Sequence, residues 1–249
     1  MIQAKYKSMA DDQITENAFS ASAEDYLISY EYQGTSSHEQ ILKLTKQSKG
    51  YFIAKRIFDI ISASLLLVVI WPIMVIIGIA IKLDSKGPVI YKHKRIGRFY
   101  KPIYLYKFRS MVENADDLIA KFTPEQQKIW NENFKLEHDP RVTKVGRFLR
   151  KTSLDELPQL INIIKGEMSV VGPRPVVEDE LKKYGKDSDK FVSFLPGLTG
   201  YWQAYARSDC SYVQRMRMEL FYIDRANFWW DMKIICATIV AILRGKGAR

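Results

Sequence analysis

Hydrophobic residues are distributed unevenly along this chain, and the longest apolar run predicts its first element. Residues 60–81 read IISASLLLVVIWPIMVIIGIAI, which is 22 residues without a charge. A helix that crosses a bilayer needs about 20 apolar residues, whereas a core helix of a soluble domain is usually shorter and apolar on one face. The run therefore predicts a helix that lies in a membrane.

The charges beside this run indicate how it enters the membrane. Lys55 and Arg56 precede it, and residues 82–109 hold nine Lys or Arg and one Asp. Lys and Arg mark the cytoplasmic side of a membrane helix, so a run with positive charge at both ends fits best when both ends stay on one side. The flanks favour a re-entrant anchor over a helix that spans the bilayer.

Pro72 lies near the middle of the run and indicates where such an anchor would turn. Proline removes a backbone donor and disfavours helix at the preceding residue, here Trp71. We therefore predict a helix-break-helix hairpin over residues 51–85, with its break at Trp71-Pro72. Proline kinks also occur in spanning helices, so a single kinked span stays the alternative.

The segments on either side of the hairpin differ in charge. Residues 1–50 hold five Lys and seven Asp or Glu, a net charge of −2, so with +10 overall the other 199 residues carry +12. This polar segment predicts a mobile tail with at most one docking helix, and it lacks the basic and apolar regions of a signal peptide. Residues 86–249 are expected to form one domain that faces the cytosol.

Local patterns within this domain indicate an α+β fold that is mostly helical. Residues 89–111, VIYKHKRIGRFYKPIYLYKFRSM, alternate β-branched or aromatic residues with basic ones, which predicts a small strand pair with a basic face. Residues 112–135 are polar and predict a helix.

Two further segments predict amphipathic helices. Residues 141–151 place four basic residues on one face and three apolar residues on the other (Arg141, Lys144, Arg147, Arg150; Val142, Val145, Leu149). Such a helix suits an anionic membrane surface or solvent equally well. Residues 234–243 are apolar but too short to span a bilayer, and Trp229 and Trp230 precede them. We expect an interfacial helix there; a helix packed on the core is the alternative.

Composition narrows the classes of function. The chain has 249 residues, a net charge of +10 and 47% hydrophobic residues, which excludes a disulfide-stapled mini-protein and a wholly disordered chain. Cys210 and Cys236 form no CxxC pair, and neither the cysteines nor the three histidines have zinc-site spacing. The positive charge indicates an anionic partner: nucleic acid, an acidic membrane or a phosphorylated substrate.

The stretch from Arg150 to Pro175 holds the best candidates for chemistry. Ser153 and Glu156 have the spacing of a capping box, and Pro158 is tolerated in a first helical turn, so Asp155 and Glu156 are expected in the first turn of a short helix that Gly166 ends. On spacing alone, two acids that favour the helix dipole are a sufficient explanation.

Basic neighbours favour a catalytic explanation of the same acids. Arg150 lies just before the pair, and Arg174 lies between two prolines that fix its backbone. Two carboxylates would repel a phosphate unless a cation intervened, and Mg²⁺ is commonly held by one or two carboxylates plus substrate phosphates. An Asp can then attack phosphorus, as in aspartyl-phosphate enzymes. The motifs alone thus predict a membrane-bound, phosphate-handling protein.

The sequence resembles the bacterial sugar transferases, the monotopic polyprenol-phosphate phosphoglycosyl transferases of the minimal catalytic-domain type. The resemblance runs from about residue 52 to the end of the chain, and residues 1–50 match nothing known to us. The matching motifs are KRIFDI (55–60), the apolar run with its proline, KRIGR (94–98), YKFRSM (106–111), VGRFLRKTSLDELPQLINIIKGEMSVVGPRP (145–175) and PGLTGYWQ (196–203).

This resemblance implies an enzyme of the cytoplasmic face of the bacterial cell membrane that initiates exopolysaccharide, capsule or other surface glycan assembly. It would transfer a sugar phosphate from a UDP-sugar to undecaprenyl phosphate, releasing UMP, by way of a phosphosugar-aspartate intermediate. Asp155 would be the nucleophile, and Glu156 would help to hold Mg²⁺.

The resemblance also assigns binding roles. Lys107, Arg150 and Arg174 would contact substrate phosphates, and the Pro173-Arg174-Pro175 turn would lie at the nucleotide end. In the membrane anchor, Lys55 and Arg56 would reach the lipid headgroups, Asp59 would pair with Lys55, and Pro72 would mark the break.

Some features stay open. Many relatives have a Ser before the hairpin proline, where this chain has Trp71, and residues 204–216 lie in a region that varies with the sugar, so the sequence leaves the sugar open. A catalytically inactive membrane adaptor is the alternative function, although the intact acidic pair and Arg174 argue against it. Nucleic acid is not an expected partner, because the chain has none of the common binding motifs and residues 60–81 would be unexplained.

Overall fold

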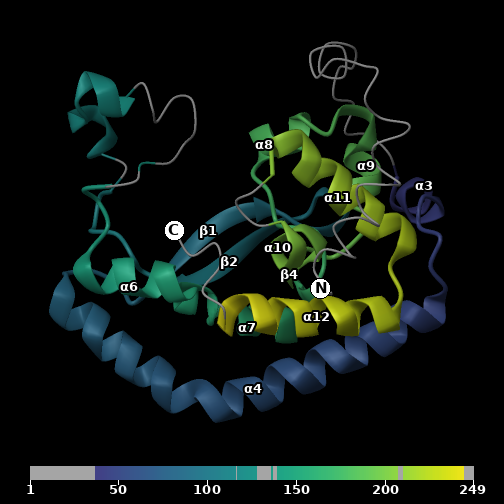
Figure 1. The fold of residues 1–249 in the computed structure, drawn as a ribbon, viewed down its shortest axis with the longest axis horizontal. Coiled ribbons are helices and arrows are strands. Elements are labelled where there is room, and N and C mark those ends of the chain that lie inside the picture. Colours follow the sequence, from purple (N-terminus) through teal and green to yellow (C-terminus); the bar gives the residue numbers. More distant parts are fainter. Residues whose placement is uncertain (1–36, 116, 128–135, 137–138, 207–209, 244–249) are drawn as a thin grey trace.

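The computed structural model describes residues 37–115, 117–127, 136, 139–206 and 210–243. A long helix lies beneath a body of shorter helices and two small sheets (Figure 1). The α-helices in the described ranges are α3 (His38–Lys43), α4 (Lys49–Asp84), α6 (Lys144–Thr152), α7 (Gln159–Lys165), α8 (Glu178–Lys182), α9 (Ser188–Phe191), α10 (Tyr201–Tyr205), α11 (Tyr212–Arg225) and α12 (Phe228–Leu243). The strands there are β1 (Ile90–Ile96), β2 (Pro102–Phe108), β3 (Ser169–Val171) and β4 (Gly197–Thr199).

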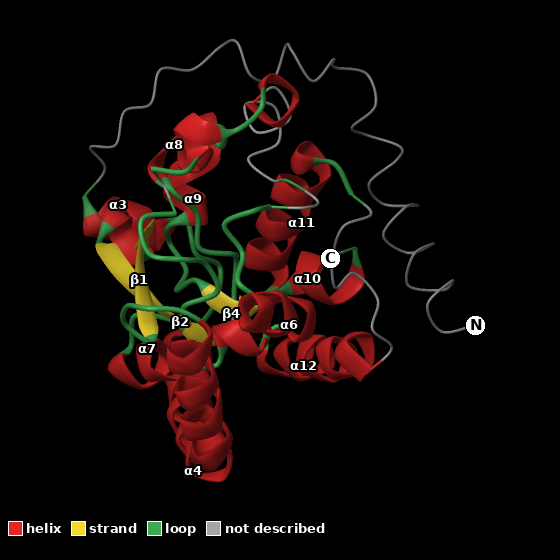
Figure 2. Ribbon diagram, turned by 90° about the vertical axis from the view of Figure 1, so that its left-hand side faces the viewer, coloured by secondary structure: helices red, strands yellow, loops and turns green. Residues whose placement is uncertain are grey.

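Helix α4 contains the apolar run and is longer than expected. It has 36 residues and begins after Ser48, whose side chain accepts a hydrogen bond from the Tyr51 backbone N–H. Among the described residues, α4 is the helix long and apolar enough to cross a membrane. Figure 1 shows it bent, and Figure 2 shows it projecting below the rest of the domain.

The predicted break at Trp71-Pro72 is wrong. The helix continues through Pro72 and ends at Asp84. A proline removes one backbone donor and crowds the preceding turn, so it can kink a helix while the flanking turns stay helical. The bend of α4 is therefore the structural feature that corresponds to the expected break.

The first part of α4 is tied to the body by buried polar contacts. Lys55 donates to Asp231 of α12 at 2.7 Å, and the side chains are 8% and 3% exposed. Asp231 also accepts from the hydroxyls of Tyr51 and Tyr222, at 3.0 and 2.7 Å. This places Lys55 inside the protein, which corrects the expectation that it reaches the lipid headgroups: the carboxylate of Asp231 holds it inward.

Arg56 and Asp59 make the next two contacts with the body. Arg56 donates to the carbonyls of Ile163 and Ile164, at 2.6 and 2.8 Å, and so caps the carboxyl end of α7. Asp59 is 1% exposed and accepts from the Val170 N–H in β3 at 2.9 Å. Its hydrogen-bond partner is thus the backbone of β3 rather than Lys55, which is engaged with Asp231.

The far end of α4 returns to the same body. The Asp84 carboxylate accepts from the Val145 N–H in the first turn of α6 at 3.0 Å. Arg109, which follows β2, donates to the Ser85 carbonyl at 2.7 Å. Both ends of α4 are therefore held by the domain that carries the sheets.

The β1–β2 pair confirms the predicted strands. The strands are antiparallel, with Lys107 opposite Tyr91 and Ile96 opposite Pro102. Leu105 and Phe108 of β2 are buried against α7 and the second half of α4. The parallel β3–β4 pair was not predicted, because three-residue strands leave no periodic pattern.

The segment from α6 to α7 differs from the expected capping box. Ser153 ends α6 in a left-handed conformation with φ of 59°, and its side chain makes no cap hydrogen bond. Asp155 and Glu156 lie in a 3₁₀ turn, η3 (Leu154–Glu156), and α7 starts only at Gln159. Ser153 thus both ends α6 and precedes η3, without the side-chain hydrogen bond of a capping box. Gly166 ends α7 with φ of 82°, as predicted.

The predicted basic helix is α6, with one difference. Lys144, Arg147 and Arg150 are exposed and Leu149 is buried. Arg141 lies before the helix, is 2% exposed and forms a close ion pair with Asp139 at 2.7 Å. It therefore does not belong to the exposed basic face.

The carboxyl-terminal helix α12 combines both expectations for it. Ile234 and Asp231 are buried against the body, so the helix packs on the core. Its other side leaves large apolar residues exposed: Trp229, Ile239, Val240 and Ile242. The helix runs beside α4 (Figure 1). Helix α4 itself exposes apolar side chains along most of its length.

Two predicted segments fall partly outside the described residues. Of the tail predicted over residues 1–50, residues 37–50 contain α3, whose Ile41 is buried in the main core, and the first residues of α4. Of the helix predicted over residues 112–135, the described residues up to 127 form turns, the short 3₁₀ helix η2 (Ile119–Lys121) and one helical turn. The predicted continuous helix is therefore wrong over its first part.

Candidate active site

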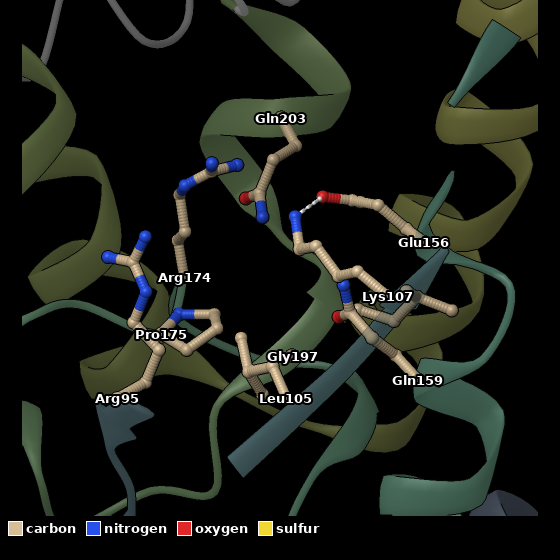
Figure 3. A pocket seen from close by; sticks show the side chains of 10 residues that line it. Arg95, Leu105, Lys107, Glu156, Gln159, Arg174, Pro175, Gly197 and Gln203 are labelled. Atoms are coloured by element: carbon tan, nitrogen blue, oxygen red, sulfur yellow. Dashed lines mark hydrogen bonds and ion pairs between the residues drawn. The ribbon is translucent and has the colours of Figure 1, made fainter. Parts of the chain in front are cut away.

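A cleft of about 310 Å³, counting its open mouth, lies between the two sheets. Its lining comes from β1, β2, η3, α7, β4, α10 and the loop after β3: Arg95, Leu105, Lys107, Glu156, Gln159, Arg174, Pro175, Gly197, Leu198 and Gln203. Figure 3 shows Lys107 and Glu156 on one side of this cleft and Arg95 and Arg174 on the other. Four of the residues assigned by resemblance thus meet here: Lys107, Glu156, Arg174 and Pro175.

Lys107 and Glu156 form the central ion pair. The lysine is on β2 and the glutamate is in η3, and their Nζ and Oε1 atoms are 2.6 Å apart. Burial tends to raise the pKa of Glu156, but Lys107 and Arg174 outweigh it and lower the pKa below its usual value. Glu156 is therefore a carboxylate at neutral pH.

Asp155 directly precedes Glu156, and its pKa is shifted in the opposite direction. Burial raises its pKa, and the neighbouring charge of Glu156 raises it too, while Lys107 and Arg150 oppose the rise. Among the described residues it forms no ion pair within 4.0 Å. A carboxylate that is more basic than usual and forms no close ion pair is suited to act as a nucleophile.

Arg150 is positioned by a contact with Ser110, just after β2. Its Nε donates to the hydroxyl of Ser110 at 2.8 Å. Helix α6 approaches Ser110 so closely that a Cβ on Gly146 would lie 2.0 Å from the Ser110 carbonyl oxygen. Glycine at position 146 therefore allows α6 to bring Arg150 within electrostatic reach of Asp155.

The Pro173-Arg174-Pro175 turn leads out of β3 and presents Arg174 to the cleft. The Pro173 carbonyl accepts from the Gly197 N–H at 2.8 Å, and the Arg174 N–H donates to Glu219 at 2.9 Å. The guanidinium of Arg174 lies 5.9 Å from the ring centroid of Trp202. The backbone of the turn is thus fixed while the charged end of Arg174 faces the cleft.

Sequence reasoning assigned no role to several residues that line the cleft. Arg95 lies within the quoted KRIGR motif, but only the β1–β2 register, with Arg95 opposite Ile103, places it across the cleft from Lys107. Gln159 and Gln203 add amide groups. Lys55, Arg56, Asp59 and Pro72 belong to α4 and do not line the cleft.

The donor set offers carboxylate oxygen and little else for a metal ion. No group of three or more His, Cys, Asp or Glu side chains with metal-site geometry occurs in the described residues. Asp155 and Glu156 nevertheless fit Mg²⁺, which often binds one or two carboxylates and completes its shell with waters and substrate phosphates. Lys107 already donates a hydrogen bond to Glu156 Oε1. Lys107 and Mg²⁺ would therefore share the Glu156 carboxylate.

Comparison with known proteins agrees with the motifs. A family model described as "Bacterial sugar transferase" matches residues 50–245. The chain belongs to the bacterial sugar transferase family. This confirms the resemblance seen in the sequence.

Proteins of named function are similar to this one over most of its chain. It is 42% identical over 220 residues to an undecaprenyl-phosphate galactose phosphotransferase of Salmonella typhimurium, covering 85% of this chain and 46% of that protein. It is 43% identical over 199 residues to the exopolysaccharide production protein ExoY of Rhizobium meliloti, covering 79% and 88%. It is 38% identical over 205 residues to a UDP-glucose:undecaprenyl-phosphate glucose-1-phosphate transferase of Escherichia coli, covering 79% and 41%. The chain spans about half the length of the longer relatives.

Proposed function

We propose that this sugar transferase moves a hexose 1-phosphate from a UDP-sugar to undecaprenyl phosphate and releases UMP. One observation carries the proposal: Asp155, whose pKa is raised, directly precedes Glu156, and Glu156 forms an ion pair with Lys107 in a cleft with two arginines opposite. Asp155 itself adjoins this cleft and is not one of its lining residues. The functions of the named relatives suggest the substrate classes, an undecaprenyl phosphate acceptor and a UDP-hexose donor.

The first step is attack by an Asp155 oxygen on the phosphorus that carries the sugar. A new O–P bond forms, the bond from that phosphorus to the bridging oxygen breaks, and UMP leaves with that oxygen. Lys107 neutralises charge beside the nucleophile, and Arg174 and Arg95 on the far side of the cleft bind the phosphate that leaves. Positioned charges of this kind stabilise a phosphoryl transition state.

The second step returns the enzyme to its starting state. A phosphate oxygen of the lipid acceptor attacks the same phosphorus, the bond to Asp155 breaks, and the diphosphate-linked sugar lipid leaves. Mg²⁺ held by Glu156 would supply charge neutralisation for the donor diphosphate. The covalent intermediate lets a water-soluble donor and a lipid acceptor use one cleft in turn.

We further propose that α4 is a re-entrant anchor on the cytoplasmic face of the membrane. Both of its ends bind the same domain, through Arg56 at one end and Asp84 at the other. Its middle exposes large apolar side chains, with Val68, Val69 and Ile76 each at least 65% exposed. Such a surface fits lipid rather than water, and a bent helix lets it dip into one leaflet and return.

The activity is tested by UMP release from the detergent-purified protein. It is mixed with undecaprenyl phosphate, Mg²⁺ and separate UDP-sugars, starting with UDP-galactose and UDP-glucose, and Asp155→Asn is run alongside. We expect release with one donor and loss of release in the variant, with the variant still membrane-bound. Silence of the wild type over a broad donor panel would refute the transferase and favour an inactive adaptor.

The topology has its own test. In a variant whose native cysteines are replaced, single cysteines are placed at Lys46, which has a side chain 75% exposed, and at Lys86. Both positions flank α4, so a membrane-impermeant maleimide should label both from the same side of oriented vesicles. Labelling from opposite sides would establish a spanning helix instead.

A further inference from the structure

The turn that presents Arg174 has an unusual shortage of backbone donors. Pro173 and Pro175 have no N–H, so the central residue holds the only backbone donor of the tripeptide. That N–H donates to the carboxylate of Glu219, on α11, at 2.9 Å. The orientation of Arg174 about its own backbone therefore depends on a side chain that is 45 residues away in the sequence.

Glu219 is placed where an acidic residue is costly. It is 2% exposed, and its second oxygen accepts a hydrogen bond from the hydroxyl of Tyr184, itself 1% exposed. Arg215, one turn earlier on α11, supplies the compensating charge, with its Nε 3.7 Å from the carboxylate. A buried carboxylate needs donors and a counter-charge to offset the lost hydration. Here the Arg174 N–H and the Tyr184 hydroxyl donate to it, and Arg215 supplies the charge from 3.7 Å.

We propose that Glu219 is a positioning residue of the donor site: it fixes the backbone of Arg174 so that the guanidinium faces the phosphate released with the nucleotide. This rests on the transferase activity proposed above. Three consecutive contacts hold the turn, from Gly197 to the Pro173 carbonyl, from Arg174 to Glu219, and from Ile96 to the Val176 carbonyl. Of these, only the contact to Glu219 comes from a side chain.

The same carboxylate also orders the cations behind the cleft. Arg215 lies over the ring of Trp202 at 5.0 Å, and Arg174 lies over that ring at 5.9 Å. By pairing with Arg215, Glu219 reduces repulsion between the two guanidinium groups. Arg174 can then remain directed into the cleft, opposite Lys107, with no acidic partner of its own within 4.0 Å among the described residues.

The test compares two variants of Glu219 with a variant of its other partner. Glu219→Met keeps the length but removes the acceptor, and Glu219→Gln keeps an oxygen that can accept from the Arg174 N–H. Tyr184→Phe removes a buried hydrogen bond to the same carboxylate without touching the turn. Steady-state kcat and KM for the active UDP-sugar, affinity for UDP by calorimetry, and Tm are measured for each.

We expect Glu219→Met to raise KM and weaken UDP binding about tenfold or more, with a smaller change in kcat, and Glu219→Gln to recover most of this loss. Tyr184→Phe should lower Tm but leave KM near that of the wild type. Equal KM and UDP affinity in Glu219→Met and wild type would overturn the proposal, as would a KM that merely follows Tm across the three variants. If the wild type neither turns over a UDP-sugar nor binds UDP, the proposed function itself fails.

Discussion

Replacing Lys107 by methionine is the sharpest test of the catalytic arrangement. Methionine keeps most of the length and apolar volume of the side chain but removes the charge that lies 2.6 Å from Glu156. Both side chains are less than one third exposed, at 21% and 29%, so solvent screens this charge only partly. The variant therefore isolates the electrostatic contribution of one cation.

The magnitude follows from the charges at the site. Two unit charges 4 Å apart interact by about 4 kcal/mol at an effective dielectric of 20, and partial exposure lowers this figure. Each 1.36 kcal/mol of transition-state stabilisation corresponds to a tenfold change in rate. We expect Lys107→Met to lower kcat/KM by about 10²- to 10³-fold, the range seen when one transition-state donor is removed.

The pH dependence gives a second, independent readout. The nucleophile must be a carboxylate, so activity falls as the pH drops through the pKa of Asp155 in the folded protein. Burial raises that pKa, and Lys107 is the charge that most opposes the rise. Removing Lys107 raises the pKa further, and the acidic limb of the profile should move to higher pH.

The assay is UMP release measured over a series of pH values, with Lys165→Met as the matched control. Lys165 also donates to a neighbouring side chain at 2.6 Å, the Tyr106 hydroxyl, but it is exposed and outside the cleft. The control should keep the rate and pH profile of the wild type. A Lys107→Met enzyme within about threefold of wild type, or with an unmoved acidic limb, would refute the reasoning.

Two further predictions concern the contacts that assemble the domain. Lys55→Met should destabilise the protein by about 3–5 kcal/mol because it leaves the buried Asp231 without its cation. The double variant Lys55→Met/Asp231→Asn should lose less stability than the sum of the two single variants. Thermal unfolding in detergent measures all three, and additive losses would contradict an interaction between the two side chains. Gly146→Ala should cost about 1–3 kcal/mol and reduce activity, because the new methyl group would overlap the Ser110 carbonyl and push α6 and Arg150 away; an unchanged Tm would argue against this close approach.

Local patterns in the sequence predicted the elements that are long or strongly periodic. The uncharged run marked α4, and the alternation in residues 89–111 marked β1 and β2. The register of the acidic turn was not predictable, because Ser153 fits both the start of a helix and the end of one. In the structure it takes both roles: it ends α6 in a left-handed conformation and precedes η3.

For the candidate site, the sequence predicted several of the residues but not their arrangement in space. The motifs contain Lys107, Glu156 and Arg174, but their meeting in one cleft depends on how the two small sheets pack. Arg95 and Glu219 carried no signal of their own in the sequence, since a basic residue in a strand and an acidic residue on a helix are usually solvated. Lys55 was misplaced for a related reason: its partner Asp231 lies 176 residues away.

Helix α4 cannot be removed or exchanged as a separate module, because the rest of the domain depends on its side chains. Within five residues it supplies the cation that Asp231 requires, the cap of α7 and the acceptor for β3, through Lys55, Arg56 and Asp59. A fragment made by deleting this helix would lose those partners and expose the surface of the domain that α4 now covers. Engineering this protein for use in solution therefore requires redesigning the exposed apolar side chains of α4 while its inner face is kept.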